Sequence, residues 1–392
     1  MSFKLTKGQA ELIDEICYWF TESIEQDYVY AGYAGTGKTS IIPFILKRLN
    51  IDPEDVLFVA FTGKATNVLM QKGFNAQTIH SAFYDLVDKP LIENGRVVYK
   101  NGRVVTKTVF EEKQFIDPRY KLIFIDEWSM VDEDKFRVIY KFGLPVIASG
   151  DPDQIDPIFG VSPFAKRIKY FLTEITRQAE NNGIVRLAND LREGFVPRHY
   201  MNYYNDAIVF PKECLTDKRM KKADVILTTK NKTRNYFNSR MREILHSYGK
   251  LPNVGDVLVC RKNCRNMILD GIPLVNGTSG KIIHPIIMDE CNLSQSIYRM
   301  DFRPDYITSG DYYEAIPCDY DFLNEPCGEK EINKYNIGLK FEYGYALTVM
   351  LAQGSQYDNV LYWDEKVGTD EAMRKIRYTA CTRAVSKFQM YI

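Results

Sequence analysis

A glycine-rich segment at residues 32–39 carries the residue types that bind a triphosphate. It matches the pattern G-x-x-x-x-G-K-[ST] at every fixed position. In this pattern the glycines let backbone N–H groups converge on phosphate oxygens, the lysine reaches the β- and γ-phosphates, and the last hydroxyl binds Mg²⁺. Lys38 and Thr39 have these last two tasks. The cradle itself would consist of Gly32, Ala34, Gly35, Thr36 and Gly37.

The segment also has the context that this pattern needs. Residues 28–31 predict a strand before it, and residues 40–46 predict a helix after it, with Pro43 in the first turn. A helix that begins at the loop adds positive potential from its N-terminus. We therefore expect a nucleoside triphosphate and Mg²⁺ to bind here, and a glycine-rich turn before an ordinary helix is the alternative.

Two adjacent carboxylates, Asp126 and Glu127, follow an apolar stretch at residues 121–125 that predicts a buried strand. Beside a bound triphosphate, Asp126 would hold Mg²⁺ through water, and Glu127 would orient or deprotonate the water that attacks the γ-phosphate. A small-molecule kinase needs no base for water, so the pair favours hydrolysis. Gln154, which follows a further strand at residues 145–149, would sense the γ-phosphate.

Other polar residues follow predicted apolar strands or lie in turns near them. An apolar strand ends at Thr62, with Lys64 just after it. The carboxyl ends of parallel strands form the edge where α/β sheets bind ligands. Thr78 and His80 lie two residues apart in a later turn, where a histidine is more often structural than functional. Gln9 lies off the apolar face of the first predicted helix, where a glutamine is usually solvated.

Two segments interrupt the α/β pattern. Between residues 90 and 118, two Asn-Gly pairs at 94–95 and 101–102 bracket alternating stretches, which is the strongest short signal for a hairpin. This hairpin carries Arg96, Lys100, Arg103 and Lys107, and a solvated hairpin with no task is the alternative. Residues 277–340 predict a small all-β segment.

Length and composition set the scale of the fold. The chain has 392 residues, 45% of them hydrophobic, which suggests two to four domains with cores of their own. The formal net charge is zero, so a polyanionic partner would need local basic grooves. The eight cysteines lack zinc-finger spacing and predict reduced thiols. No apolar run has the length of a signal segment or a membrane span, so we expect no membrane contact and a cytoplasmic location.

In their order along the chain, these segments resemble the motifs of superfamily 1 helicases, in particular the 5′-to-3′ branch typified by RecD and Dda. Residues 32–39 look like motif I, Asp126-Glu127 like motif II, and residues 150–154 like motif III. The remaining similarities are those of residues 62–65 to motif Ia, 78–80 to motif Ib, 353–355 to motif V and 378–384 to motif VI. Gln9 has the place of the adenine-reading Q motif, and Arg177 has the place of the motif IV arginine.

The resemblance implies an α/β fold with two tandem RecA-like domains and ATP with Mg²⁺ between them. Domain 1A would comprise residues 1–89 and 119–178, interrupted by the β-hairpin insert 1B at residues 90–118. Domain 2A would comprise residues 179–276 and 341–392, interrupted by a small SH3-like insert 2B at residues 277–340.

The resemblance also carries functional roles over to single residues. Arg177 and Arg383 would stabilise transition-state charge from across the cleft between the domains. Gln9 and Gly354 would contact the nucleotide. Contacts to nucleic acid would come from Phe61, Thr62, Lys64, Thr78, His80, Asn231 and Thr348.

Three residues depart from the family pattern. Phe61 replaces the usual proline of motif Ia and is either a base-stacking surface or a core aromatic. Met350 and Gln356 replace the usual histidine and glutamate of motif V. These departures bear on the grip on the strand and on its coupling to hydrolysis.

We therefore expect an ATP-dependent DNA helicase that translocates 5′ to 3′ on single-stranded DNA, with the 1B hairpin as the strand-separating pin. Its partners would be single-stranded and forked DNA, with a single-strand-binding protein or a replisome component beside them, and we expect a monomer. An RNA translocase of the same superfamily and a non-unwinding, ATP-gated strand-binding module are alternatives. Glu127 and Arg383 argue against the module, because a clamp needs neither a water-activating base nor an arginine finger.

Overall fold

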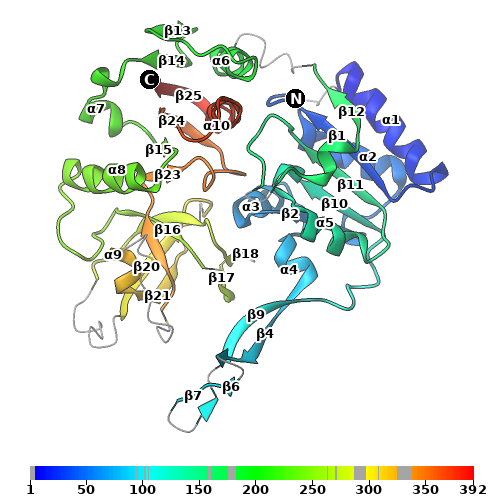
Figure 1. The fold of residues 1–392 in the computed structure, drawn as a ribbon, viewed down its shortest axis with the longest axis horizontal. Helices are drawn as coiled ribbons and strands as arrows, with labels where there is room; N and C mark the ends of the chain where they lie inside the picture. The colour runs from blue at the N-terminus through cyan, green and yellow to red at the C-terminus, as the bar shows by residue number, and fades with distance from the viewer. Residues whose placement is uncertain are drawn as a thin grey trace.

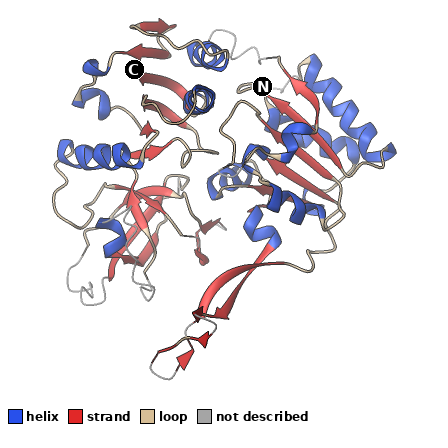
Figure 2. Ribbon diagram, in the orientation of Figure 1, coloured by secondary structure: helices blue, strands red, loops and turns tan. Residues whose placement is uncertain are grey.

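The computed structural model describes residues 5–93, 96–100, 103–104, 106–157, 160–174, 182–262, 264–269, 272–286, 297–307, 309–324 and 338–392. Figure 1 shows two α/β lobes side by side, a smaller β-rich body next to the second lobe, and a β-ribbon that projects from the first. In each lobe, helices flank a central sheet (Figure 2). Within the described ranges, no helix is long and apolar enough to cross a membrane.

The first lobe is built on six parallel strands in the order β12-β1-β11-β10-β2-β3. Tyr28 and Tyr30 pack on one face with α1, α2 and α3, whereas Val29 and Ala31 pack on the other with α4 and α5. Because both faces are covered, the strands are continuous apolar runs. The strands are β1 Asp27–Gly32, β2 Val56–Ala60, β3 Ala76–Thr78, β10 Leu122–Asp126, β11 Val146–Gly150 and β12 Ile168–Leu172. The helices are α1 Lys7–Glu22, α2 Ile42–Leu49, α3 Gly63–Gln71, α4 Ile79–Phe83 and α5 Glu133–Tyr140.

The second lobe has a six-stranded sheet in the order β13-β14-β25-β24-β15-β23, in which only the β13–β14 pair is antiparallel. α6 and α10 pack on one face of this sheet, and α7 and α8 pack on the other. The strands are β13 Met201–Tyr203, β14 Ala207–Phe210, β15 Val225–Thr228, β23 Ala346–Thr348, β24 Tyr357–Trp363 and β25 Ala384–Tyr391. The helices are α6 Gly183–Arg192, α7 Asp217–Met220, α8 Asn231–Ile244 and α10 Asp370–Cys381.

The smaller body is a five-stranded antiparallel sheet in the order β21-β20-β19-β16-β22. Its apolar side chains form a core of their own, with Tyr298, Phe302 and Phe341 fully buried. The strands are β16 Val257–Cys260, β19 Ser279–Ile282, β20 Ile297–Pro304, β21 Tyr313–Asp319 and β22 Phe341–Tyr343. A short helix, α9 Tyr320–Asn324, and a hairpin of β17 Cys264–Leu269 and β18 Ile272–Leu274 accompany it.

The predicted limits of this body, residues 277–340, are wrong at both ends. β16 lies before them and β22 just after them, yet both strands pair within this sheet. The strand character of residues 256–261 is visible in the sequence. Which sheet this strand joins depends on its pairing with residues far along the chain, and the local sequence pattern does not predict that pairing.

The projecting ribbon pairs β4 Tyr84–Pro90 with β9 Thr106–Glu112 in antiparallel register from Tyr84 opposite Glu112 to Pro90 opposite Thr106. Near its tip lie two short pairs, β5 Ile92–Glu93 with β6 Arg96–Val97 and β7 Tyr99–Lys100 with β8 Arg103–Val104. The ribbon thus lies between Thr78–His80 and Asp126, but its strands begin and end about six residues earlier than the predicted insert at 90–118. The predicted limits followed the Asn-Gly turns and Pro118, and these signals do not mark where the long strands start.

Candidate active site

The phosphate loop leaves the carboxyl end of β1 and enters a 3₁₀ turn at Lys38–Ile41, which leads into α2. Two of its glycines have left-handed backbone angles, with φ of 82° at Gly35 and 75° at Gly37. Side chains with a Cβ rarely adopt this region, so the loop requires glycine at both positions. A Cβ at Gly32 would lie 2.7 Å from the Thr36 hydroxyl, so the loop also requires glycine at its start.

Lys38 and Thr39 lie where the sequence predicts them. The Lys38 ammonium donates to the carbonyl oxygens of Gly32 at 2.7 Å and Tyr33 at 3.2 Å, so its charge lies over the loop. The Thr39 hydroxyl donates to Asp126 Oδ2 at 3.3 Å. A hydroxyl and a carboxylate side by side are hard oxygen ligands of the kind that Mg²⁺ prefers, so these residues fit a magnesium nucleotide.

The two carboxylates that follow β10 have different surroundings. The other oxygen of Asp126 accepts a hydrogen bond from the Ser149 hydroxyl at 2.7 Å, and burial, together with the charge of Glu127, raises the pKa of Asp126. Glu127 has φ 58° and ψ 53°, the left-handed region that a non-glycine residue occupies at a cost of about 1–3 kcal/mol. Such strain is typical of functional sites, and Glu127 lines a small pocket together with Gln154.

Gln154 and Arg383 meet across the boundary between the two lobes. The Arg383 guanidinium donates from Nη2 to Gln154 Oε1 at 3.2 Å, from Nε to the Thr379 carbonyl at 3.2 Å and from Nη1 to the Ser355 carbonyl at 3.4 Å. Arg383 is 4% exposed and Gln154 is 3% exposed. A buried arginine of the second lobe is therefore bonded to the predicted γ-phosphate sensor of the first.

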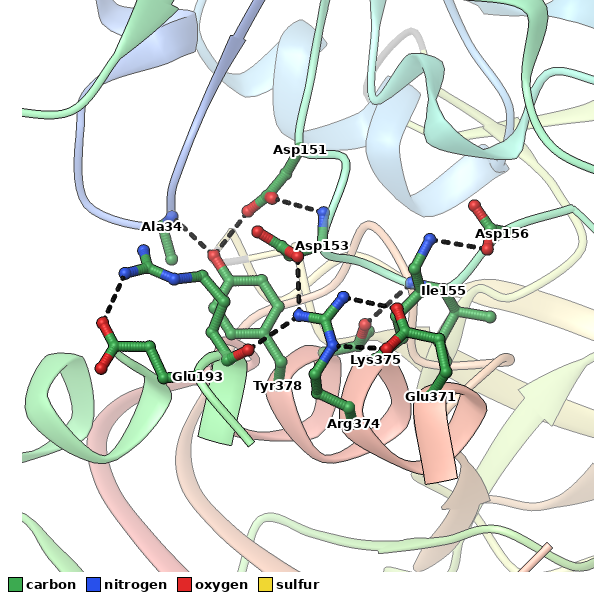
Figure 3. Close-up of polar contacts among 12 residues, drawn as sticks. Ala34, Asp151, Asp153, Ile155, Asp156, Glu193, Glu371, Arg374, Lys375 and Tyr378 are labelled. Carbon is green, nitrogen blue, oxygen red and sulfur yellow. Dashed lines mark hydrogen bonds and ion pairs between the residues drawn. The ribbon is translucent and has the colours of Figure 1, made fainter. Parts of the chain in front are cut away.

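Tyr378 connects the phosphate loop to the loop after β11. Its hydroxyl accepts a hydrogen bond from the Ala34 backbone N–H at 3.2 Å and donates to Asp151 Oδ2 at 2.6 Å, as Figure 3 shows. Burial and the nearby Asp151 carboxylate raise the pKa of Tyr378, which keeps its hydroxyl protonated as a donor. The sequence indicated motif VI at this place but not the role of its tyrosine. That role depends on contacts with two loops of the first lobe, and these contacts exist only once both lobes have folded.

Gln9 is buried behind the phosphate loop rather than solvated. Its amide nitrogen donates to the Thr36 carbonyl at 2.9 Å, and its amide oxygen accepts from the Thr6 N–H at 3.0 Å. Both ends of the amide thus support the start of α1 and the loop, and its predicted contact with adenine stays a prediction. Arg177, the second predicted finger, lies outside the described residues, so its role also stays a prediction.

Several predicted nucleic-acid contacts line a cavity of about 440 Å³ between the two lobes and the antiparallel body. They are Phe61, Thr62, Lys64, Thr78 and His80. The cavity is also lined by Arg261, Asn276, Met350 and Leu351, among others.

The side chains at this cavity have partners of their own. The Lys64 ammonium donates to the Tyr357 hydroxyl at 2.8 Å, which ties the first lobe to the second. The ring of His80 lies 5.2 Å from that of Phe110 in the ribbon and 6.3 Å from that of Phe61, between centroids. Burial, aided by the charge of Lys135, lowers the pKa of His80, so the ring is neutral at pH 7. Phe61 is both a core neighbour and a cavity wall.

Three of the predicted contacts, all of them threonines, also have structural tasks in this fold. Thr62 caps α3 by accepting from the Ala65 N–H at 3.2 Å, and Thr78 caps α4 by accepting from the Ser81 N–H at 3.2 Å. Thr348 is 8% exposed and accepts from the Leu351 N–H at 3.3 Å. These bonds leave their contacts with nucleic acid as predictions.

Two predicted site residues of the second lobe lie at other places. Asn231 is the exposed first residue of α8, and its nucleic-acid contact stays a prediction. Gly354 packs against the first lobe, where an added Cβ would lie 2.8 Å from both the Ala65 Cβ and the Thr62 hydroxyl. Its predicted contact with the nucleotide also stays a prediction.

Two protein-family models match parts of the chain. A family model described as "AAA domain" matches residues 4–209, more than half of the chain. The chain belongs to this family. A second model, "UvrD-like helicase C-terminal domain", matches residues 343–388 in the second lobe. Together with the phage T4 relative described next, these matches confirm the resemblance to superfamily 1 helicases of the Dda kind.

Two relatives of known sequence share part of the chain. The ATP-dependent DNA helicase dda of Enterobacteria phage T4 is 27% identical over 203 residues, which cover 48% of this chain and 43% of that helicase. Uncharacterized protein R530 of Acanthamoeba polyphaga mimivirus is 25% identical over 287 residues, which cover 61% of this chain and 56% of that protein. The chain spans about half the length of these relatives.

Solved structures confirm the two-domain fold. The Pif1 helicase from Candida albicans superposes with a TM-score of 0.56 at 19% identity, covering 100% of this chain and 94% of that one. The Bacteroides Pif1 helicase in complex with ADP-AlF3 and ssDNA superposes with a TM-score of 0.56 at 16% identity, covering 99% of this chain and 92% of that one. The two lobes are therefore RecA-like domains; the first is domain 1A and the second is domain 2A.

Proposed function

We propose that the chain is an ATP-dependent DNA helicase that moves 5′ to 3′ on single-stranded DNA and unwinds duplex ahead of it. The observation that carries the proposal is the hydrogen bond of 3.2 Å between Arg383 of domain 2A and Gln154 of domain 1A. It joins the two domains beside the phosphate loop and the Asp126–Glu127 pair. The T4 relative named for the same activity supports the proposal.

The residues of domain 1A would bind and activate ATP. Lys38 would hold the β- and γ-phosphates, and Thr39 and Asp126 would hold Mg²⁺. When bound, Mg²⁺ neutralises phosphate charge and orients the triphosphate. Glu127 would take a proton from the attacking water, and Gln154 would report on the γ-phosphate.

Domain 2A would complete the site only when the cleft is closed. Arg383 can place its charge on the transition state because it already reaches Gln154 across the cleft. Hydrolysis would then weaken the link between the domains, and each cycle of closure would move them relative to one another along a strand held in the cavity at Phe61 and His80. This chemistry gives ATP turnover a mechanical output.

The proposed partners are single-stranded and forked DNA, and the proposed working unit is a monomer. A single-strand-binding protein or a replisome component as a further partner is part of the same proposal. RNA is the rival strand, because stacking and phosphate contacts serve both polymers.

The test measures ATP hydrolysis alone, with a DNA oligonucleotide and with the RNA oligonucleotide of the same sequence. We expect stimulation by DNA, together with unwinding of a duplex that has a 5′ single-stranded tail but not of one that has a 3′ tail. Stimulation by RNA alone would assign the chain to RNA. ATP binding without turnover would favour the strand-binding module, and unwinding from the 3′ tail would reverse the polarity.

A further inference from the structure

One face of α10 contacts the loop of residues 151–156, which follows β11 in domain 1A. Four residues of this face, at spacings of one turn, are Arg374, Lys375, Tyr378 and Thr379. Tyr378 bonds to Asp151, and the Thr379 hydroxyl accepts from the Ile155 N–H at 3.1 Å. The loop and the helix therefore meet along several residues, not at a single point (Figure 3).

Two ion pairs form the outer part of this contact. The Arg374 guanidinium donates to Asp153 Oδ1 at 2.7 Å, and the Lys375 ammonium donates to Asp156 Oδ2 at 2.6 Å. The four side chains are between 16% and 33% exposed, so the charges are partly withdrawn from water. Arg374 and Lys375 precede the segment at residues 378–384 that resembles motif VI, and they lie outside all of the motif-like segments.

Arg374 is held in place from its own domain. It donates to Glu371 Oε1 at 2.6 Å and to the Arg192 carbonyl at 2.9 Å, in addition to Asp153. Residues of domain 2A thus direct its guanidinium at the loop of domain 1A. An arginine on an open surface would not be oriented in this way. Most exposed ion pairs contribute little to stability, because their side chains are not held in one geometry.

The loop carries Gln154 between the two acidic residues of the ion pairs. Asp153 is its neighbour on one side and Asp156 lies two residues after it. On the helix side, Arg383 follows α10 by two residues. Displacing the loop along the helix would therefore separate the Gln154 amide from the Arg383 guanidinium, because each is attached to one side of the same contact.

We propose that Arg374 and Lys375 are positioning residues that hold the loop 151–156 in register with α10 and so keep Gln154 and Arg383 together. The inference rests on the proposed function, since it assigns these residues to ATP turnover. They act through Gln154 and Arg383 and not on the nucleotide itself. The loop would then follow α10 as the domains close, which links the nucleotide site to the movement of domain 2A.

The Lys375–Asp156 pair allows the sharper test, because Arg374 has further bonds. The variants are Lys375→Asp, Asp156→Lys and the double variant with both changes, which exchanges the two charges. Lys366→Asp is the matched control. It makes the same change of charge near the start of α10, in an exposed pair with Asp370 that does not reach domain 1A.

Two measurements are made on each protein. Hydrogen–deuterium exchange of residues 151–156, without nucleotide, reports whether the loop is held, and the Ile155 amide is the most direct probe. Steady-state ATP hydrolysis at saturating single-stranded DNA gives kcat and the KM for ATP separately.

We expect each single reversal to increase exchange in the loop and to lower kcat about tenfold, with the KM for ATP within about threefold of its original value. The double variant is expected to restore slow exchange and to bring kcat within about threefold of the original protein. The control is expected to match the original protein in both measurements. A merely structural contact would not give this division between kcat and KM, nor the rescue.

Unchanged exchange and kcat in both single variants would overturn the proposal, as would a double variant no better than the worse single one. If a reversal destabilises the whole chain, Lys375→Gln and Asp156→Asn replace it, with smaller effects expected in the same direction. If the original protein shows no ATP hydrolysis, the proposed function fails. The exchange measurement still decides whether the ion pairs hold the loop.

Discussion

At the scale of single residues, the site combines groups proposed to bind a triphosphate with groups that form hydrogen bonds between the two domains. Lys38 and Thr39 belong to the first kind, and Tyr378 and Arg383 belong to the second. Tyr378 makes the connection, because its hydroxyl bonds to the phosphate loop at Ala34 and to Asp151 at once. The phosphate loop is therefore joined to α10 directly, through one hydrogen bond to Tyr378.

Changing Lys38 to alanine removes the full positive charge that lies over the phosphate loop. We expect ATP hydrolysis to fall to background, because no other described side chain of the loop carries a positive charge to the phosphates. The fold should persist, as judged by the melting temperature. Lys47→Ala, at an exposed lysine of α2, is the control and should keep its activity. DNA-stimulated turnover in the Lys38 variant would contradict the assignment of the phosphate loop.

Changing Glu127 to glutamine keeps the size of the side chain but removes the carboxylate that we propose as the general base. We expect ATP affinity to be retained and turnover to fall by about two orders of magnitude or more, the usual cost of losing a general base. Glu133→Gln makes the same change at an exposed residue of α5 and should be active. The measurement is kcat with single-stranded DNA, and an unchanged kcat would assign the base to another residue.

Which residues the sequence could predict depends on how local their signal is. Lys38, Thr39, Asp126 and Glu127 stand in short patterns whose chemistry follows from type and spacing. From the residues alone, Gln9 had a solvated side chain as its ordinary interpretation, and only the motif resemblance placed it at the nucleotide. It is fully buried, because its amide bonds to the phosphate loop, 27 residues away along the chain.

At the scale of elements, the ribbon is the part of domain 1A that extends farthest from the sheet (Figure 1). It is anchored at its base, where Phe110 and Tyr84 pack against His80 with centroid distances of 5.2 and 5.6 Å. Near its tip, Ile92 is 63% exposed and Tyr99 is 64% exposed. A base packed beside the predicted strand cavity and exposed apolar side chains near the tip are suited to separating strands.

Replacing residues 91–105 with a short Gly-Ser linker removes the tip and leaves the β4–β9 pairing intact. We expect DNA-stimulated ATP hydrolysis and movement on single strands to continue, whereas unwinding from a 5′ tail collapses. The physical reason is that a wedge only blocks the partner strand, while the motor pulls the other strand past it. Opening a base-pair step costs about 1–2 kcal/mol, which the motor can supply.

The control for this variant keeps the ribbon and changes only Ile92 and Tyr99 to serine. Slow unwinding in the control would assign the effect to the apolar tip, and normal unwinding would assign it to the length of the ribbon. Loss of ATP hydrolysis in the linker variant would instead make the tip part of the strand grip. Normal unwinding by the linker variant would show that the ribbon separates no strands.

The elements that the sequence predicted best are the buried parallel strands, whose apolar runs follow directly from coverage of both sheet faces. The ribbon and the antiparallel body were predicted from turn signals and composition. Their predicted limits are therefore wrong, by about six residues at each end of the ribbon and by about twenty residues at the start of the body, where β16 begins at Val257. β4 contains Lys89 and Pro90, which are poor strand signals, and only its pairing with β9 shows that it is a strand.

At the scale of the whole molecule, the two domains approach each other closely where motif V meets motif Ia. Gly354 in domain 2A lies against Thr62 and Ala65 at the start of α3, and the nearby Lys64 donates to Tyr357. Gly354 also has a left-handed backbone, with φ of 74°. Both motifs could be predicted from the sequence. The contact between them could not, because it depends on how two separately folded sheets face each other.

Changing Gly354 to alanine places a methyl group 2.8 Å from both the Ala65 Cβ and the Thr62 hydroxyl. This is too close for either contact, so the domains must separate at this point. We expect DNA-stimulated kcat to fall by about tenfold or more, because the clash raises the free energy of the closed arrangement of the two domains. An increase of about 1.4 kcal/mol is enough to lower a rate tenfold. ATP affinity should change little if Gly354 acts at the domain contact.

Gly368→Ala is the matched control for the backbone. Gly368 has a similar left-handed φ of 65°, so both variants have the same kind of strain, but its added methyl group would meet only the Ala372 Cβ, at an ordinary 3.7 Å. We therefore expect Gly368→Ala to keep kcat within about threefold while losing comparable thermal stability. Equal loss of kcat in both variants would mean that backbone strain and not domain contact limits turnover. A large loss of ATP affinity at Gly354 alone would instead place this glycine at the nucleotide, as the motif resemblance implies.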